Sequence, residues 1–201
     1  MAAKDKRRVY IILHQRGALS FGVNRRRLGY AAYHWGIIAP PKESTGRDCY
    51  LFDVFDGHMI DPATNIDRNP SLVWKRRSRS NINPNLSGSL VAQIMIGKVP
   101  NDVTFQQMDA SLNTLPVPRK GILPEENCVT WIRLAIGKLQ EEGWAEQFDI
   151  DRFLDFSLAY ADGRTGYESK RIFNYTARPM KPNLWWVLSR GMKRRLSELL
   201  G

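Results

Sequence analysis

A chain of 201 residues with 43% hydrophobic and 25% charged residues has the composition of a folded protein that buries a core. It suits one domain with an extension, since domains most often have roughly 100–150 residues. The formal net charge of +10 favours an anionic partner, and no apolar run reaches the roughly 18 residues that span a membrane.

The cysteine count and the N-terminus bear on the cellular compartment. Cys49 and Cys128 are too few for a disulfide framework. The charged N-terminus leads into a short apolar run, Val9 to Leu13, which is too brief for the core of a signal peptide. We therefore expect a soluble, cytoplasmic protein in a reducing environment.

Three short segments in the first third of the chain predict strands. Val9–Leu13 is aliphatic and β-branched, and Tyr33–Ile38 and Tyr50–Phe55 are apolar segments joined by a loop with Pro, Gly and Ser. The last two are expected to be antiparallel neighbours. Because side chains alternate along a strand, His34 and Asp53 can share a face only if the register allows it.

Residues 56–89 are predicted to be a long loop, because Asp-Gly, Asp-Pro and Asn-Pro pairs, which favour turns, recur along them. A basic segment lies inside this loop. Such a stretch is often a lid or a binding loop. The chain is accordingly divided into a single α+β domain over residues 1–177, with this basic loop, and a C-terminal basic amphipathic helix over 178–201. Residues 184–200 of that helix could touch a membrane surface.

The middle of the chain predicts one further strand and several helices. Leu90–Val99 has strand character, and a helix is expected from a cap at Asp102 or Thr104 as far as Leu115. Asn127–Gly143 is the clearest helix, because Asn127 is a favourable N-cap and apolar positions recur at helical spacing. The later segments are expected to be a helix from Asp149 to Tyr160 and an extended piece from Arg171 to Thr176.

A cysteine at a predicted helix start and an upstream histidine are the best indications of chemistry. Cys128 follows Asn127, where the helix dipole and unpaired N–H groups favour a thiolate. His34 lies early in the run Tyr-His-Trp-Gly-Ile-Ile, where a rigid strand can hold it as a base. The two residues are therefore a candidate nucleophile and general base.

The strings His-Trp-Gly-Ile at 34–37 and Glu-Asn-Cys-Val at 126–129 resemble the strand and helix-start motifs of the circularly permuted NlpC/P60 superfamily. The similarity is to the branch with lecithin:retinol acyltransferase-like proteins, where histidine precedes cysteine. It implies Cys128 as nucleophile, His34 as base and Asp53 as the residue that orients the imidazole. The lipid-acting branch usually has histidine at the third position, so Asp53 departs from the pattern and leaves the substrate open.

Other residues compete for these roles. Asp56 could orient the imidazole in place of Asp53, and His14 and His58 are the remaining histidines. Cys128 could also be an inert buried thiol, His34 a histidine satisfied in the core, and Asp53 the partner of an arginine. The histidines, cysteines and aspartates lack the close paired spacings of zinc sites, so neither a metal nor a cofactor is expected.

Basic residues occur in four runs: Lys4 to Arg8, Arg25 to Arg27, Lys75 to Arg77 with Arg79, and Lys193 to Arg195. Basic patches raise the local concentration of polyanions, although each run could instead be a solvated surface. The candidate anion- or substrate-binding residues are Arg25, Arg26, Arg27, Lys75, Arg76, Arg77 and Arg79.

The expected fold is α+β, with a small antiparallel sheet that carries His34 and Asp53, the Cys128 helix packed against it, and additional C-terminal helices. The expected function is cysteine-dependent acyl-enzyme chemistry, as a thiol acyltransferase, hydrolase or amidase. The acyl donor is expected to be anionic: a lipid, an acyl carrier or an aminoacyl-tRNA. The alternative is a noncatalytic basic module that binds nucleic acid or an anionic membrane surface, with Trp74, Trp185 or Trp186 stacking on bases.

Overall fold

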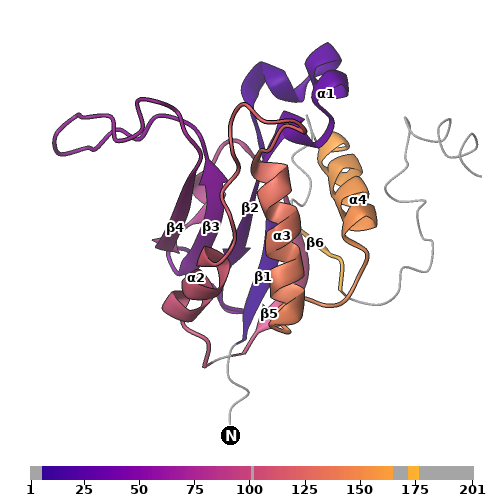
Figure 1. Ribbon diagram of the computed structural model, residues 1–201. Coiled ribbons are helices and arrows are strands. Elements are labelled where there is room, and N and C mark those ends of the chain that lie inside the picture. The colour runs from indigo at the N-terminus through magenta and orange to yellow at the C-terminus, as the bar shows by residue number, and fades with distance from the viewer. Residues whose placement is uncertain (1–5, 101, 165–171, 177–201) are drawn as a thin grey trace, which may run out of the picture.

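A six-stranded sheet is the framework of an α+β fold (Figure 1). The computed structural model describes residues 6–100, 102–164 and 172–176. The strands are β1 (Arg7–Gln15), β2 (Tyr33–Ala39), β3 (Cys49–Phe55), β4 (Lys75–Ile82), β5 (Leu90–Val99) and β6 (Ile172–Asn174). They lie in the order β4-β3-β2-β1-β5-β6, and the neighbours are antiparallel except β5 and β6, which are parallel.

Helices join and cover these strands. The α-helices are α1 (Gly22–Leu28), α2 (Phe105–Asn113), α3 (Cys128–Glu141) and α4 (Ile150–Asp162), and the 3-10 helices are η1 (Gly17–Ser20), η2 (Gly29–Ala32) and η3 (Pro84–Leu86). Polar side chains fix where the longer helices begin. Thr104 and Asn127 each form a capping box, and the Asp149 side chain accepts a hydrogen bond from the Arg152 N–H.

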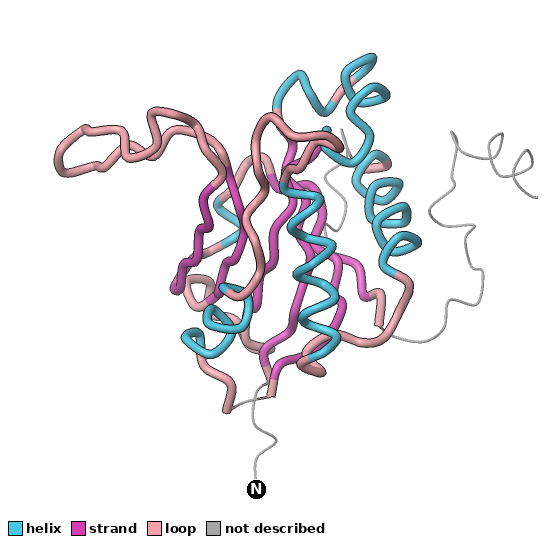
Figure 2. The backbone as a smooth tube through the Cα atoms, in the orientation of Figure 1, coloured by secondary structure: helices cyan, strands magenta, loops and turns pink. Residues whose placement is uncertain are grey.

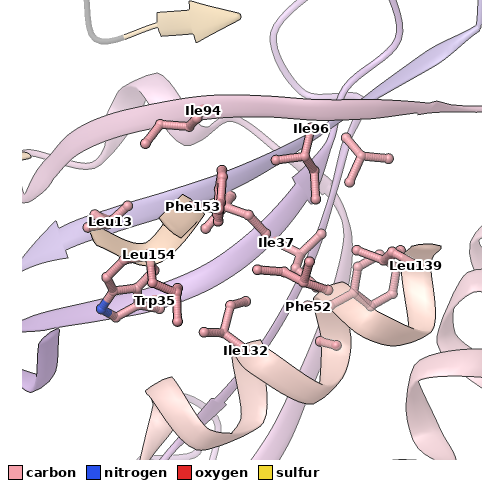
Figure 3. Close-up of a cluster of buried hydrophobic side chains, with 14 of the residues drawn as sticks. Leu13, Trp35, Ile37, Phe52, Ile94, Ile96, Ile132, Leu139, Phe153 and Leu154 are labelled. Atoms are coloured by element: carbon pink, nitrogen blue, oxygen red, sulfur yellow. The ribbon is translucent and has the colours of Figure 1, made fainter. Parts of the chain in front are cut away.

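The main core lies between one face of the sheet and the helices. Alternate residues of the strands, among them Trp35, Ile37 and Phe52, pack against Ile132 of α3 and Leu154 of α4 (Figure 3). Figure 2 shows α3 in front of the strands and a loop between β3 and β4 that extends away from the sheet. Burial of each such side chain contributes about 1.5–3 kcal/mol, so this face holds the fold together.

The opposite face of the sheet carries a smaller apolar cluster made of strand residues. Its buried members are Tyr10, Ile12, Ile38, Cys49, Leu90 and Met95, with Leu51 and Ile82 packed beside them. We call this side the open face, because within the described ranges its apolar cluster draws on no α-helix. Residues at alternate positions of β2 and β3, including His34 and Asp53, belong to it.

The strand and helix predictions for 9–13, 33–38, 50–55, 90–99 and 127–143 are confirmed, as are the helices near 104–115 and 149–160. The extended piece near 171–176 appears as β6. The expected helix over 178–201, with its membrane-facing stretch 184–200, lies outside the described residues. Among those that are described, no helix is long and apolar enough to cross a membrane.

The prediction of a continuous loop over residues 56–89 is wrong, because residues 75–82 form β4 and 84–86 form η3. The sequence Lys-Arg-Arg-Ser-Arg-Ser-Asn-Ile has no apolar alternation, which is the usual mark of a strand. β4 is an edge strand held by main-chain pairing with β3, and charged side chains are common on such edges.

Candidate active site around His34

His34 and Asp53 meet on the open face because of the β2–β3 register. Asp53 lies opposite Gly36, two residues beyond His34, so all three positions share this face. The His34 Nε2 and Asp53 Oδ2 atoms are 2.9 Å apart. Gly36 leaves the space between them open, since a Cβ there would lie 3.2 Å from the Asp53 Cβ.

Asp53 is a buried carboxylate, 2% exposed, with partners on two strands. Arg77 lies directly opposite it on β4 and donates from Nε to Oδ1 at 2.8 Å and from Nη2 to Oδ2 at 2.5 Å. Burial would raise the pKa of Asp53, but hydrogen bonds from His34 and Arg77 outweigh it and lower that pKa. Asp53 therefore stays ionised and holds the imidazole in place.

Cys128 is the first residue of α3 and lies beside the start of β2. Its Sγ is 3.8 Å from the carbonyl oxygen of Tyr33, and the residue is 1% exposed. The β2–β3 pairing begins at Gly36, so Tyr33 and His34 pair with β1 but lie beyond the part of β2 that pairs with β3. The first residue of α3 therefore contacts β2 outside its pairing with β3, at the residue that precedes His34.

His34 is bonded to the Asp53 carboxylate and follows Tyr33, whose carbonyl oxygen contacts the Cys128 thiol. Burial alone would lower the pKa of His34, but hydrogen bonds to Asp53 and Cys128, with their charges, raise it to about 9. The imidazole is therefore protonated at neutral pH. The three residues singled out from the sequence, Cys128, His34 and Asp53, are thus brought together by the fold.

The competing residues lie elsewhere. Asp56 forms an ion pair with Lys120 at 3.1 Å, which removes it as an alternative orienter of His34. His58 is 65% exposed, and its Nδ1 is 2.6 Å from Oδ2 of Asp67 within the β3–β4 loop. Neither residue contributes to the His34 cluster.

His14 is a neighbour of the site that sequence reasoning left ambiguous. It lies opposite His34 across β1 and β2, and the two ring centroids are 6.3 Å apart. Its Nδ1 is 3.0 Å from the Ser89 Oγ. Burial, followed by repulsion from His34, lowers the pKa of His14 to about 4, so it is neutral beside a charged partner. Only the strand register, which the sequence does not fix, could have revealed this pair.

The basic residues proposed as an anion-binding set do not form one surface. Arg25 is held by Asp162 at 2.6 and 2.5 Å, whereas Arg26 and Arg27 are exposed on α1. On β4 the side chains alternate: Arg77 lies opposite Asp53 on the open face, and Arg76 lies opposite Val54 on the helix-covered face. The Arg76 Nε is buried without a hydrogen-bond partner in the described part of the chain. Lys75 donates to the Arg68 carbonyl, and Arg79 is exposed.

Two cavities flank the candidate active site. One, of about 430 Å³, lies on the open face and is lined in part by His14, His34, Asp53 and Arg79. The other, of about 520 Å³, is lined by Trp74 and by the loop before α3, including Glu125 and Glu126. Cys128 is too deeply buried to line either cavity.

Residues 6–185, most of the chain, match a family of unknown function, DUF6914. The chain belongs to this family. No curated protein and no solved structure matches it significantly. Family membership therefore gives the chain relatives without assigning an activity to the His34 cluster.

The cluster offers no metal-binding set. Across residues 6–100, 102–164 and 172–176, no group of three or more His, Cys, Asp or Glu side chains is arranged to hold a metal ion. Cys49, the second thiol, is buried in the open-face cluster, and burial raises its pKa to about 12. Cys49 is therefore an internal reference for an unreactive thiol.

Proposed function

We propose that this protein is a cysteine-dependent acyl-transfer or hydrolytic enzyme, with Cys128 as nucleophile, His34 as acid and base, and Asp53 as the residue that orients His34. The main support is the position of the His34 imidazole, which binds the Asp53 carboxylate at 2.9 Å, while the Cys128 thiol lies 3.8 Å from the carbonyl oxygen of Tyr33, the residue before His34. A histidine held in this way matches the requirement of a thiol nucleophile for an adjacent, oriented base.

The proposed reaction has two steps. The Cys128 sulfur attacks a carbonyl carbon as the thiolate, paired with the protonated His34, and the C–S bond of a thioester forms as the bond to the leaving group breaks. The protonated His34 gives its proton to that leaving group. Neutral His34 then accepts a proton from water, an amine or an alcohol, which attacks the thioester and frees the Cys128 sulfur. Since Asp53 engages Nε2, the ring nitrogen left for these transfers is Nδ1.

We expect the start of α3 to stabilise the oxyanion. The Val129 N–H already donates to the Asn127 Oδ1 at 2.8 Å, so it is occupied by the helix cap. The Cys128 N–H, in contrast, is one of the first N–H groups of the helix, which have no intrahelical acceptor. It is the main-chain donor that we assign to the developing oxyanion.

Acyl transfer in the manner of the permuted NlpC/P60 superfamily is the form of this chemistry that the sequence motifs favour. The histidine-first order of the chain and the packing of the cysteine-bearing helix on the sheet support that relationship. An anionic acyl donor, such as a lipid, an acyl carrier or an aminoacyl-tRNA, is proposed from the net charge of +10. Because Cys49 and Cys128 are both free thiols, we also propose a reducing, cytoplasmic setting.

Alkylation of the two cysteines with iodoacetamide, followed by peptide mass spectrometry between pH 5 and 10, tests the proposal. Cys128 should react faster than Cys49 at neutral pH, because an imidazolium stabilises a neighbouring thiolate. This advantage should disappear in His34→Ala. The matched control is His58→Ala, which removes an exposed histidine and should leave the ratio of the two rates unchanged.

Trapping of an acyl-enzyme tests the same residue by its chemistry. Incubation with p-nitrophenyl acetate should add one acetyl group at Cys128, detected on the intact protein and located by peptide mapping. Equal alkylation of Cys128 and Cys49, together with no acetyl group on Cys128, would show that the thiol is a packing residue and would overturn the proposal.

A further inference from the structure

The cavity on the open face has two kinds of wall. Its floor is formed by aliphatic side chains of the first three strands, Ile12, Ile38 and Leu51. Arginines of β4 line one side, and the segment after η3, with Ser87 and Ser89, lines another. At about 430 Å³ the cavity lies within the usual range of small-molecule pockets, roughly 300–1,000 Å³.

The charged groups at this cavity leave an excess of positive charge. Arg77 and His34 both bind Asp53, so this single carboxylate is already shared by two cations. Arg79 lies two residues beyond Arg77 on the same side of β4 and is exposed. It makes no ion pair or side-chain hydrogen bond with residues that the structure describes. Its guanidinium is therefore available to an anion.

Neutral donors face the same space. The Nδ1 of His14 lies 3.0 Å from the Ser89 Oγ and 3.3 Å from the Ser87 Oγ. When a serine hydroxyl donates to Nδ1, the His14 proton resides on Nε2, which then becomes a donor. A guanidinium, an imidazole N–H and a serine hydroxyl are together suited to the several oxygens of a phosphate group.

We propose that this cavity is a binding site for an aliphatic phosphate monoester. The phosphate binds Arg79 and the His14–Ser87–Ser89 wall, and the aliphatic chain lies on the floor of Ile12, Ile38 and Leu51. The site is on the open face of the sheet, and its ligand needs no reaction with Cys128. His34 and Asp53 also line this cavity, but the contacts proposed for the ligand are made by other residues, so binding does not depend on acyl transfer at Cys128.

Isothermal titration calorimetry of the full chain with octyl phosphate tests the site. Octanol has only the aliphatic chain of this ligand and inorganic phosphate only its phosphate group, so both should bind much more weakly. Octanoate separates a requirement for phosphate from a requirement for any anion. Arg79→Gln should weaken octyl phosphate binding by about tenfold or more, because hydrogen bonds between charged groups are among the strongest.

Three further variants make the outcome decisive. Arg27→Gln removes the same charge from the exposed surface of α1 and should bind like the wild type. Leu51→Ala should weaken octyl phosphate while leaving inorganic phosphate unchanged. Cys128→Ser should retain full affinity, so a failure of the acyl-transfer proposal would not affect this result. The absence of binding to the wild type, equal affinity for octanoate, or equal losses in Arg79→Gln and Arg27→Gln would overturn the proposal.

Discussion

The ion pairs of Asp53 illustrate how a buried carboxylate is tolerated at the scale of one residue. Its two oxygens accept hydrogen bonds from His34 and from both ends of the Arg77 fork. Removing a buried charge from such a set leaves the remaining cations unpaired, and this costs more than the pair itself contributes. Asp53 is therefore the residue on which the structure of the site depends most.

Asp53→Asn is expected to lower the free energy of unfolding by about 3–5 kcal/mol, since it leaves Arg77 and His34 without their carboxylate. It should also lower the pKa of His34. Urea denaturation measures the first effect and NMR titration of the imidazole protons measures the second. Asp67→Asn, which removes the charged partner of the exposed His58, is the control and should lower the free energy of unfolding much less, because exposed ion pairs contribute little. Equal losses in the two variants would contradict this account.

The two histidines at the site predict opposite effects of pH on stability. The pKa of His34 is raised to about 9 by its contacts with Asp53 and Cys128, against burial. The contribution of His34 to the free energy of unfolding is complete below about pH 6.5, the ordinary pKa of histidine. It is lost as the pH rises towards 9. Burial lowers the pKa of His14 to about 4. The contribution of neutral His14 to the free energy of unfolding is therefore lost as the pH falls from 6.5 towards 4.

Urea denaturation at a series of pH values separates these contributions. Between pH 6.5 and 9, the free energy of unfolding should fall more steeply for the wild type than for His34→Gln. Between pH 6.5 and 4, it should fall more steeply for the wild type than for His14→Gln. If both variants followed the wild-type curve, the burial of His14 and the contacts of His34 with Asp53 and Cys128 would not be shifting the pKa values as described.

At the scale of elements, the close approach of β5 to the chain after α3 depends on a glycine. A Cβ at Gly97 would lie 2.1 Å from the carbonyl oxygen of Trp144 and 2.6 Å from the Cα of Ala145. Both atoms belong to the main chain, so a side chain at this position requires the segment after α3 to move away from the sheet. The Glu146 N–H donates to the Ile96 carbonyl at 2.9 Å and holds this contact together.

Gly97→Ala should therefore lower the melting temperature sharply, with a loss of about 3 kcal/mol or more, as overpacking of a closed contact does. Gly137→Ala is the matched control, because its Cβ meets only the Ile150 Cδ1, at 3.9 Å. That variant should be as stable as the wild type or gain up to about 1 kcal/mol, because alanine is the better helix former. Thermal unfolding followed by circular dichroism measures both, and an unchanged melting temperature in Gly97→Ala would contradict the close contact.

The elements also show what the sequence could and could not predict. Apolar strands and capped helices are predictable because burial and capping produce a pattern in neighbouring residues of the sequence. Leu90–Val99 and the helix that begins at Cys128 are examples. β4 is not predictable in this way, because its charged side chains lack an apolar pattern and the strand is held by main-chain pairing with β3. α1 was missed because Gly-Val-Asn-Arg-Arg-Arg-Leu has no buried residue to create a periodic face.

From the sequence, the candidate site can be predicted as a set of residues but not as an arrangement in space. His34, Asp53 and Cys128 could be named from local motifs, but their meeting depends on the β2–β3 register and on where α3 packs. Arg77 as the second partner of Asp53, and His14 as the neighbour of His34, follow from pairings between strands. Such pairings are non-local, and the residues that make them carry no distinguishing sequence signal.

At the scale of the whole molecule, the sheet separates the two thiols. Cys49 belongs to the cluster on the open face, whereas Cys128 belongs to the core under the helices. They also lie near opposite ends of β2, because Cys128 contacts Tyr33 and the neighbour of Cys49, Tyr50, pairs with Ala39. Six residues of strand at about 3.3 Å each place these two ends roughly 20 Å apart.

The native protein should therefore form no intramolecular disulfide, because a disulfide requires Cα atoms within about 7 Å of each other. Treatment with diamide, followed by mass spectrometry of the monomer, should find no intramolecular bond between Cys49 and Cys128. The same treatment in concentrated urea is the control, since the unfolded chain can bring the two cysteines together. An intramolecular disulfide formed under native conditions would mean that the strand order or the position of α3 differs from the one described, because no side-chain rearrangement spans that separation.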